Sequence, residues 1–383
     1  MHPKWKFWNG GSDLEERIYS QWDGQRMSEL HKKASAIVRE RQQVLAKAVL
    51  DIQYARQPDF WKKFGERGRA LSLRDVHYHL SYLTESIQAQ DVSVFARYTE
   101  WMTQLFAGLG FPDDTVRITL ECLRTALEDS LPEDLFAIAD AHIEEGLAQT
   151  QKPSSAVPTH LDETAPLYPL TKKYLEALLS GEKQTASRLI LDAVERGTNI
   201  KDIYLEVFQR SQYEIGRLWC LNKISVAQEH YSSAATQLIM SQLYPRIFAG
   251  KKIGRSLVAA CVNSELHEIG IRMVADFFEI EGWDTYYMGA NTPARSIIQA
   301  IEKNRPHILA LSVTMPFHQS LLQETIANVR ASDADGRVKI IVGGHALNSS
   351  KNLWKDLGAD GYAGNAEEAV RLAKQLMDKE QRD

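Results

Sequence analysis

Apolar and polar positions follow two different periods along this chain, and the change between them divides it into regions. Through residue 150, apolar side chains recur at positions i, i+3 and i+4, which is the period of an amphipathic helix. The predicted helices cover residues 28–56, 73–89, 92–109, 114–130 and 132–147. Residues 1–150 are therefore expected to form an all-helical domain.

A polar, proline-rich stretch then interrupts the helical period. Residues 151–169 contain Pro153, Pro158, Pro166 and Pro169 among polar side chains, which is typical of a linker. The helical period resumes after it, with short connections, over residues 170–179, 183–196, 200–221 and 225–247. This spacing predicts a four-helix bundle within residues 170–250.

The pattern changes again from residue 254 to residue 383. Short apolar runs alternate there with amphipathic helical stretches, and the runs cover residues 255–261, 285–288, 308–313, 339–342 and 361–363. Strands that alternate with helices indicate a parallel, doubly wound sheet. We therefore expect a five-stranded α/β domain of the Rossmann-like, flavodoxin-like class after the all-α N-terminal region and the bundle.

Composition narrows the classes of function. The chain has 383 residues, a formal net charge of −5 and a pI near 6.2, and we find no contiguous basic stripe, so direct nucleic-acid binding is not expected. Only Cys122, Cys220 and Cys261 are present, without metal-ligand spacing, which favours a reducing, cytoplasmic location. No stretch reaches the length of an apolar membrane span, and the first residues are too polar for a signal peptide.

One histidine lies on the turn between the first predicted strand and the helix that follows it. The turn runs from Glu265 to Gly270 and includes Leu266 and His267. Ligands of open α/β sheets bind at the carboxyl ends of the strands, and a neutral imidazole there can ligate a metal when a carboxylate orients its ring. Glu265 is placed to be that carboxylate. Taken alone, the motif also fits an ordinary surface histidine at the start of a helix.

Small and hydroxyl-bearing residues follow two later strands. Ser312 and Thr314 come at the end of the third strand, and Gly343 and Gly344 at the end of the fourth. Together with the His267 turn, this order resembles corrinoid-binding domains. The resemblance implies that His267 ligates the cobalt of cobalamin and that the other residues line a slot for its nucleotide tail. In that slot a glycine avoids a clash between Cβ and the displaced dimethylbenzimidazole. By itself, Gly-Gly also fits a tight turn.

The predicted bundle carries a second motif. Trp219 and Cys220 are followed after a short interval by Glu229 and His230. This string resembles light-sensing adenosylcobalamin domains, known from light-dependent repressors of carotenoid synthesis. The resemblance implies that the tryptophan packs over the adenosyl group and that the Glu-His pair contacts it. Those repressors have a histidine where this chain has Cys220, so the cobalt ligand after photolysis is left open between Cys220, another histidine and water.

The predicted helix over residues 73–89 concentrates groups that suit an open-chain tetrapyrrole, namely Arg74, His77, Tyr78, His79 and Tyr82. Aromatic rings pack on the plane of a bilin, imidazole bonds its lactam and guanidinium pairs with its propionates. This region resembles photocobilins, which implies biliverdin binding next to a cobalamin domain. Because Cys122 lies in an apolar helical stretch, attachment is expected to be non-covalent. Aromatic stripes at helical spacing also fit an ordinary core.

These expectations combine into one hypothesis and two rivals. The hypothesis is a cytoplasmic light sensor, not an enzyme, in which photolysis of adenosylcobalamin changes domain contacts or homo-oligomeric state and signals to an unknown downstream protein. No DNA-reading helix pair is recognisable before residue 150. One rival is a corrinoid shuttle protein of a methyltransferase system. The other is a cobalamin-binding partner of a separate regulator that does not respond to light.

Overall fold

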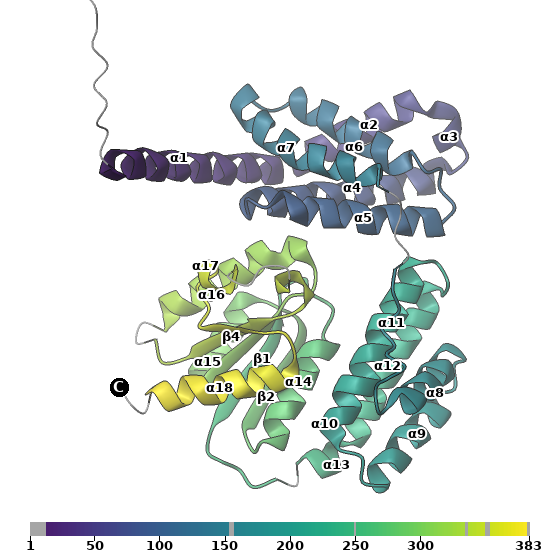
Figure 1. The fold of residues 1–383 in the computed structure, drawn as a ribbon, viewed down its shortest axis with the longest axis vertical. Helices are drawn as coiled ribbons and strands as arrows, with labels where there is room; N and C mark the ends of the chain where they lie inside the picture. The colour runs from purple at the N-terminus through teal and green to yellow at the C-terminus, as the bar shows by residue number, and fades with distance from the viewer. Residues whose placement is uncertain (1–12, 153–156, 249, 334–335, 349–352, 381–383) are drawn as a thin grey trace, which may run out of the picture. The chain divides into compact units, whose positions relative to one another are not determined.

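The computed structural model divides the chain into two compact units, residues 1–154 and 155–383 (Figure 1). It describes residues 13–152, 157–248, 250–333, 336–348 and 353–380. The expectations for the first residues of the chain and for Pro153 in the linker lie outside the described residues. Within the described part of the chain, no helix is both long and apolar enough to cross a membrane.

The first unit is helical throughout its described residues, which confirms the prediction. Its helices are α1 (Asp13–Glu40), α2 (Gln42–Arg56), α3 (Pro58–Lys62), α4 (Gly65–Gln88), α5 (Val92–Gly108), α6 (Thr115–Glu128) and α7 (Glu133–Thr150). Several bounds differ from the expectation; α1, for example, begins at Asp13 and not at residue 28. The segment 28–56 is not one helix, because its helical geometry is interrupted at Arg41 (φ −93°, ψ 8°). Helix α4 begins at Gly65, before the apolar period that the sequence shows from residue 73.

The core of this unit holds neutral polar pairs among its apolar side chains. Nδ1 of His79 lies 2.6 Å from the hydroxyl of Tyr98, and Nδ1 of His142 lies 2.7 Å from that of Ser86. Burial lowers the pKa of both histidines to about 4, with the charge of His31 adding to the effect at His142. Both imidazoles are therefore uncharged at neutral pH, as buried hydrogen-bonded groups usually are.

The second unit opens with the predicted four-helix bundle. Its elements are α8 (Tyr168–Leu179), α9 (Lys183–Glu195), α10 (Ile200–Asp202), η1 (Ile203–Gln209), α11 (Arg210–Cys220), α12 (Val226–Gln242) and α13 (Tyr244–Ile247). The expected helix over 200–221 contains a π-helical segment, η1, between α10 and α11. The expected helix over 225–247 stops at Gln242, because Pro245 has no N–H to continue the hydrogen-bond ladder.

The rest of the unit is the predicted parallel α/β domain. Its strands are β1 (Ser256–Val262), β2 (Asp284–Thr292), β3 (Ile308–Ser312), β4 (Lys339–Gly343) and β5 (Gly361–Ala363), in the order β2-β1-β3-β4-β5. Its helices are α14 (Ile269–Ile280), α15 (Ala294–Asn304), α16 (Gln319–Ser332), α17 (Leu353–Asp356) and α18 (Ala366–Glu380), with 3₁₀ turns η2 (Pro316–His318) and η3 (His345–Leu347). This is the flavodoxin-like strand order.

The sheet has a separate apolar core on each face. Alternate residues of β1, such as Ala259 and Cys261, join α14, α18 and the bundle in one core, whereas Val258 and Ala260 join α15 and α16 in another. The bundle and the sheet therefore form a single unit, which the 2.7 Å hydrogen bond from Tyr204 to Asp276 also bridges. Strands β1 and β3 are neighbours whose following loops lead away in opposite directions. Their carboxyl ends form the point where ligands of such sheets bind.

Candidate functional site

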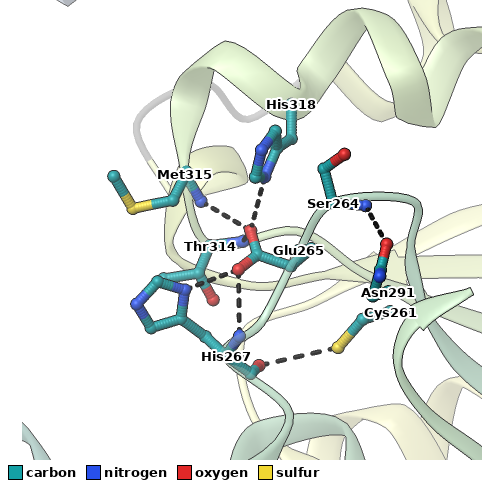
Figure 2. A network of polar contacts seen from close by, with 8 residues as sticks. All are labelled: Cys261, Ser264, Glu265, His267, Asn291, Thr314, Met315 and His318. Carbon is teal, nitrogen blue, oxygen red and sulfur yellow. Dashed lines mark hydrogen bonds and ion pairs between the residues drawn. The ribbon is translucent and has the colours of Figure 1, made fainter. Parts of the chain in front are cut away.

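A buried carboxylate joins the loops that follow β1 and β3. Glu265 is fully buried, and its Oε1 accepts hydrogen bonds from the backbone N–H of His267 at 3.0 Å and from Nδ1 of the same residue at 2.5 Å (Figure 2). Its Oε2 accepts the backbone N–H groups of Thr314 and Met315 at 2.8 and 2.9 Å, and lies 3.1 Å from Nδ1 of His318. Glu265 is thus the central acceptor of the site.

These contacts lower the pKa of Glu265 and favour one tautomer of the neutral His267. Burial by itself raises the pKa of Glu265, but the hydrogen bonds from His267, His318 and the backbone bring it well below its ordinary value. The hydrogen bond to Glu265 raises the pKa of His267, burial opposes this effect, and the charges of Glu265 and Glu229 add to it. A neutral His267 that donates its Nδ1 proton to Glu265 presents Nε2 as a lone-pair donor, which is the arrangement of a metal-ligating histidine.

A second carboxylate holds the other side of the same turn. Oε2 of Glu268 accepts the backbone N–H of Ala290 at 3.0 Å and the hydroxyl of Tyr287 at 2.9 Å, both from β2. Its Oε1 accepts from the side chain of Gln237 on α12 at 3.2 Å. The turn that carries His267 is therefore attached to the segment after β3 on one side and to β2 and the bundle on the other. His267 itself remains 57% exposed, beside Leu266 at 70%.

A narrow slot of about 90 Å³ opens between α14 and the ends of β3, β4 and β5. It is lined by Gly270, Ser312, Gly343 and Gly344, as the sequence predicted, and by two bundle residues, Gln209 and Tyr213. A Cβ added to Gly270 would meet no protein atom within 4 Å, so this glycine faces open space. The slot is a suitable place for an elongated group that lies along the sheet.

The glycine pair has a structural reason that the sequence did not reveal. A Cβ at Gly344 would lie 2.2 Å from the carbonyl oxygen of Val313, and one at Gly343 would lie 2.7 Å from that of Ala363. Gly344 also has a φ of +103°, which L-residues rarely adopt. The pair is therefore required by the close approach of the protein's own backbone. Thr314, in contrast to the glycine pair, does not line the slot; its backbone N–H binds Glu265.

The bundle brings one of its predicted residues toward His267. Glu229 on α12 is close enough for its charge to raise the pKa of His267. Its carboxylate is held by Ser233 at 3.1 Å and by Nδ1 of His230 at 2.5 Å, while the His230 side chain is 75% exposed. Trp219 is half-buried at the end of α11. Cys220 is buried, and burial raises the pKa of its thiol, so it is a protonated thiol at neutral pH.

The predicted bilin residues of α4 separate into two sets. His79 and Tyr82 are buried, and Tyr82 stacks on Tyr98 of α5 with ring centroids 3.8 Å apart. The other three are accessible: Arg74 and Tyr78 are exposed and His77 is half-buried. The five side chains thus do not converge on one surface.

Sequence reasoning missed several residues of both sites. His318 and Met315 contact Glu265 from the loop after β3, and Gln209 and Tyr213 reach the slot from the bundle. On α4, Asp75 lies beside Arg74, with the carboxylate 3.8 Å from the guanidinium, and near Tyr98; burial raises the pKa of its carboxyl. An acidic residue within an aromatic helical stretch was the available signal for Asp75.

Comparison with known families assigns both units. Residues 255–373 match a family described as B12 binding domain, and residues 170–244 match a second family of the same description. The second unit is a B12-binding module. Residues 23–149, which cover most of the first unit, match the family described as phycobilisome protein. The chain thus joins a cobalamin-binding module to a phycobilisome-like unit.

Individual relatives resemble only part of the chain. Dimethylamine corrinoid protein 3 of Methanosarcina mazei is 27% identical over 167 residues, which are 43% of this chain and 96% of that protein. A corrinoid protein of Desulfitobacterium hafniense is 22% identical over 209 residues, covering 53% of this chain and 95% of its own. The structure of the Methanosarcina barkeri monomethylamine corrinoid protein matches 55% of this chain and 99% of its own at 20% identity, with a TM-score of 0.50, a likeness of fold.

Proposed function

We propose that this protein is a light sensor that binds adenosylcobalamin in its second unit and a bilin in its first. The observation that carries the proposal is the union, in one chain, of a B12-binding module and a unit that matches phycobilisome proteins. A protein that only shuttles methyl groups has no need of a second, helical unit of that family. A receptor with two chromophores needs such a unit to bind the second one.

The residues around the His267 turn fit a cobalamin whose lower ligand is a protein imidazole. His267 would supply Nε2, Glu265 would hold the ring in its orientation, and the slot beside Gly270 would take the displaced nucleotide tail. When bound, adenosylcobalamin supplies a cobalt–carbon bond that visible light breaks. The exposed side chain of Leu266 gives the turn an apolar surface on which the corrin ring would pack.

The bundle is the proposed sensor of the upper ligand. Trp219 and Glu229 belong to α11 and α12, and Glu229 is near His267. A broad indole would fill space above the corrin, and the carboxylate would accept hydrogen bonds from ribose hydroxyls. Loss of the adenosyl group would leave both side chains without these contacts, so α11 and α12 would repack. Because tightly packed interfaces have discrete arrangements, the expected output is a change in assembly.

The first unit is the proposed bilin site. The exposed side of α4 carries Arg74 and Tyr78, next to the carboxylate of Asp75. Guanidinium suits the propionates of a bilin, and a carboxylate suits the N–H groups of its pyrroles. His79 and Tyr82 would support this surface from the core through Tyr98. Cys122 is fully buried in α6, so non-covalent binding is proposed.

Light scattering coupled to size exclusion tests the sensor directly. The adenosylcobalamin form is measured in the dark and after green light, with the methylcobalamin form as the control. We expect the mass of the adenosyl form to change on illumination, and the methyl form not to reproduce the dark mass of the adenosyl form. An unchanged mass alongside complete photolysis would contradict signalling through assembly. Addition of biliverdin tests the first unit: absence of a red-shifted, protein-induced band would leave it without a bilin.

One observation favours a second candidate, a corrinoid shuttle of a methyltransferase system. Relatives that match 43–54% of this chain are named dimethylamine corrinoid proteins. A shuttle would keep its cobalt accessible and would exchange a methyl group with partner enzymes. Preference for adenosylcobalamin over methylcobalamin separates the two functions. Equal affinity for both forms, in the wild type and in Trp219→Ala, would mean that the protein does not recognise the adenosyl group. That result would favour the shuttle function.

A further inference from the structure

The slot beside α14 has one wall that belongs to the bundle and not to the sheet. Gln209 and Tyr213 line it from the end of η1 and from α11, and the amide of Gln209 donates to the hydroxyl of Tyr213 at 3.1 Å. Tyr213 is 46% exposed, whereas other large apolar side chains that line the slot, such as Met273 and Ile341, are buried in the core. Tyr213 is therefore the large side chain of this wall that has room to move.

The slot is too small for a bicyclic base as it stands. Its volume of about 90 Å³ is well below the roughly 150 Å³ of a cavity that holds a single benzene ring. Its other walls are mainly strand backbone, small residues and side chains such as Met273 and Ile341, which are buried in a close-packed core and resist displacement. Insertion of a nucleotide tail consequently has to push on the wall made by Tyr213.

The same tyrosine touches the linker between the two units. Its ring contacts that of His160, with centroids 5.5 Å apart. The residue after Tyr213, Glu214, is buried, and its Oε2 accepts the backbone N–H of His160 and the hydroxyl of Thr159, each at 3.0 Å. Arg217 completes this anchor, because it binds Glu214 through two nitrogens and donates to the carbonyl of Val157 at 3.3 Å.

We propose that Tyr213 positions the nucleotide tail of cobalamin and, through its contact with His160, couples insertion of that tail to release of the linker segment 157–161. The inference rests on the proposed binding of cobalamin with its tail in this slot. The buried ion pair between Glu214 and Arg217 holds the segment in one arrangement. Displacement of Tyr213, the residue before Glu214, weakens that arrangement. Occupancy of the cofactor site is in this way passed to the segment that leads to the first unit.

Amide hydrogen exchange of the full-length protein tests this coupling. The probes are hydroxocobalamin and aquocobinamide, which share the corrin ring and differ in the nucleotide tail. We expect the amides of His160 and Leu161 to be protected to the same degree in the aquocobinamide-loaded protein as in the protein without cofactor. Hydroxocobalamin is expected to speed their exchange severalfold, because only the tail displaces Tyr213. The visible spectrum, recorded in parallel, reports binding and imidazole ligation independently of exchange.

Three variants sharpen the outcome. Tyr213→Phe keeps the ring and should keep the response, whereas Tyr213→Ala should show fast exchange with every probe. Glu214→Gln should give fast exchange before any cofactor is added, while its spectrum still shows bound cobalamin. Spectra without bound cobalamin would refute the proposed function and this inference together. Normal imidazole-ligated spectra with exchange that is unchanged or slower in the wild type would overturn the coupling alone.

Discussion

Nδ1 of His267 lies 2.5 Å from Oε1 of Glu265, and the carboxylate is fully buried while the imidazole is more than half exposed. The two residues belong to one turn, but Glu265 is held in place by the backbone of a different loop, at Thr314 and Met315. The orientation of His267 is thus set by the contact between the loops after β1 and β3. A preoriented ligand loses little freedom when a metal binds.

Replacement of His267 by alanine should remove the imidazole-ligated spectrum of bound cobalamin. Removal of a residue that only orients a metal ligand lowers affinity at least about tenfold. Because His267→Ala removes the ligand itself, the affinity for cobalamin should fall by at least this factor. Absorption spectra and equilibrium dialysis measure both effects. His307→Ala is the matched control, since His307 bonds Ser256 at the opposite end of the sheet. Equal spectra for His267→Ala and the wild type would refute the ligand assignment.

Glu265→Gln should damage both stability and cofactor binding. An amide places an NH₂ group against N–H donors and leaves at least one buried donor unpaired, which costs about 1–3 kcal/mol of unfolding free energy. Loss of the orienting carboxylate should also weaken imidazole ligation about 10- to 100-fold. Thermal melts and cobalamin titrations give the two values. Glu281→Gln, just beyond the other end of α14, should lose the ion pairs with Lys201 and Lys374 and leave cobalamin affinity unchanged.

Two glycines of the site should respond in opposite ways. Gly344→Ala should lower the melting temperature, because its Cβ would lie 2.2 Å from the carbonyl oxygen of Val313 at a φ of +103°. Gly270→Leu should leave the melting temperature unchanged or raise it, since that position faces open space within a helix. The leucine should, however, block the slot and prevent imidazole-ligated binding. Normal cobalamin spectra in Gly270→Leu would mean that the tail lies elsewhere.

The sequence was sufficient for the order of elements and for the Glu265–His267 pair, because both depend on local period and on neighbours in the chain. It was insufficient for His318, Gln209 and Tyr213, which reach the site only after the sheet and the bundle have packed together. The role of Gly344 was also hidden. A glycine that avoids a ligand and a glycine that avoids a carbonyl oxygen look the same until the backbone is placed.

The first unit should lose stability in mild acid. His79 and His142 have pKa values lowered to about 4, so below pH 6.5 the unfolded chain binds protons that the folded unit does not. The free energy of unfolding therefore falls with decreasing pH from about 6.5 to 4, by about 2 kcal/mol per histidine between pH 7 and pH 5. Denaturant unfolding of the full chain at both pH values, for wild type and His142→Gln, measures the contribution of one histidine. An identical pH dependence in the variant would show that His142 is not buried as a neutral group.

The central claim is that this chain binds adenosylcobalamin through His267 and responds to light. The most direct test is the visible spectrum of the adenosylcobalamin-loaded protein, kept in the dark and then exposed to green light. We predict an imidazole-ligated alkylcobalamin spectrum in the dark and its complete conversion to a cobalamin without the adenosyl group after illumination, with His267→Ala lacking the dark imidazole-ligated form. A dark spectrum that is the same with and without His267, or one that green light leaves unchanged, would contradict the account.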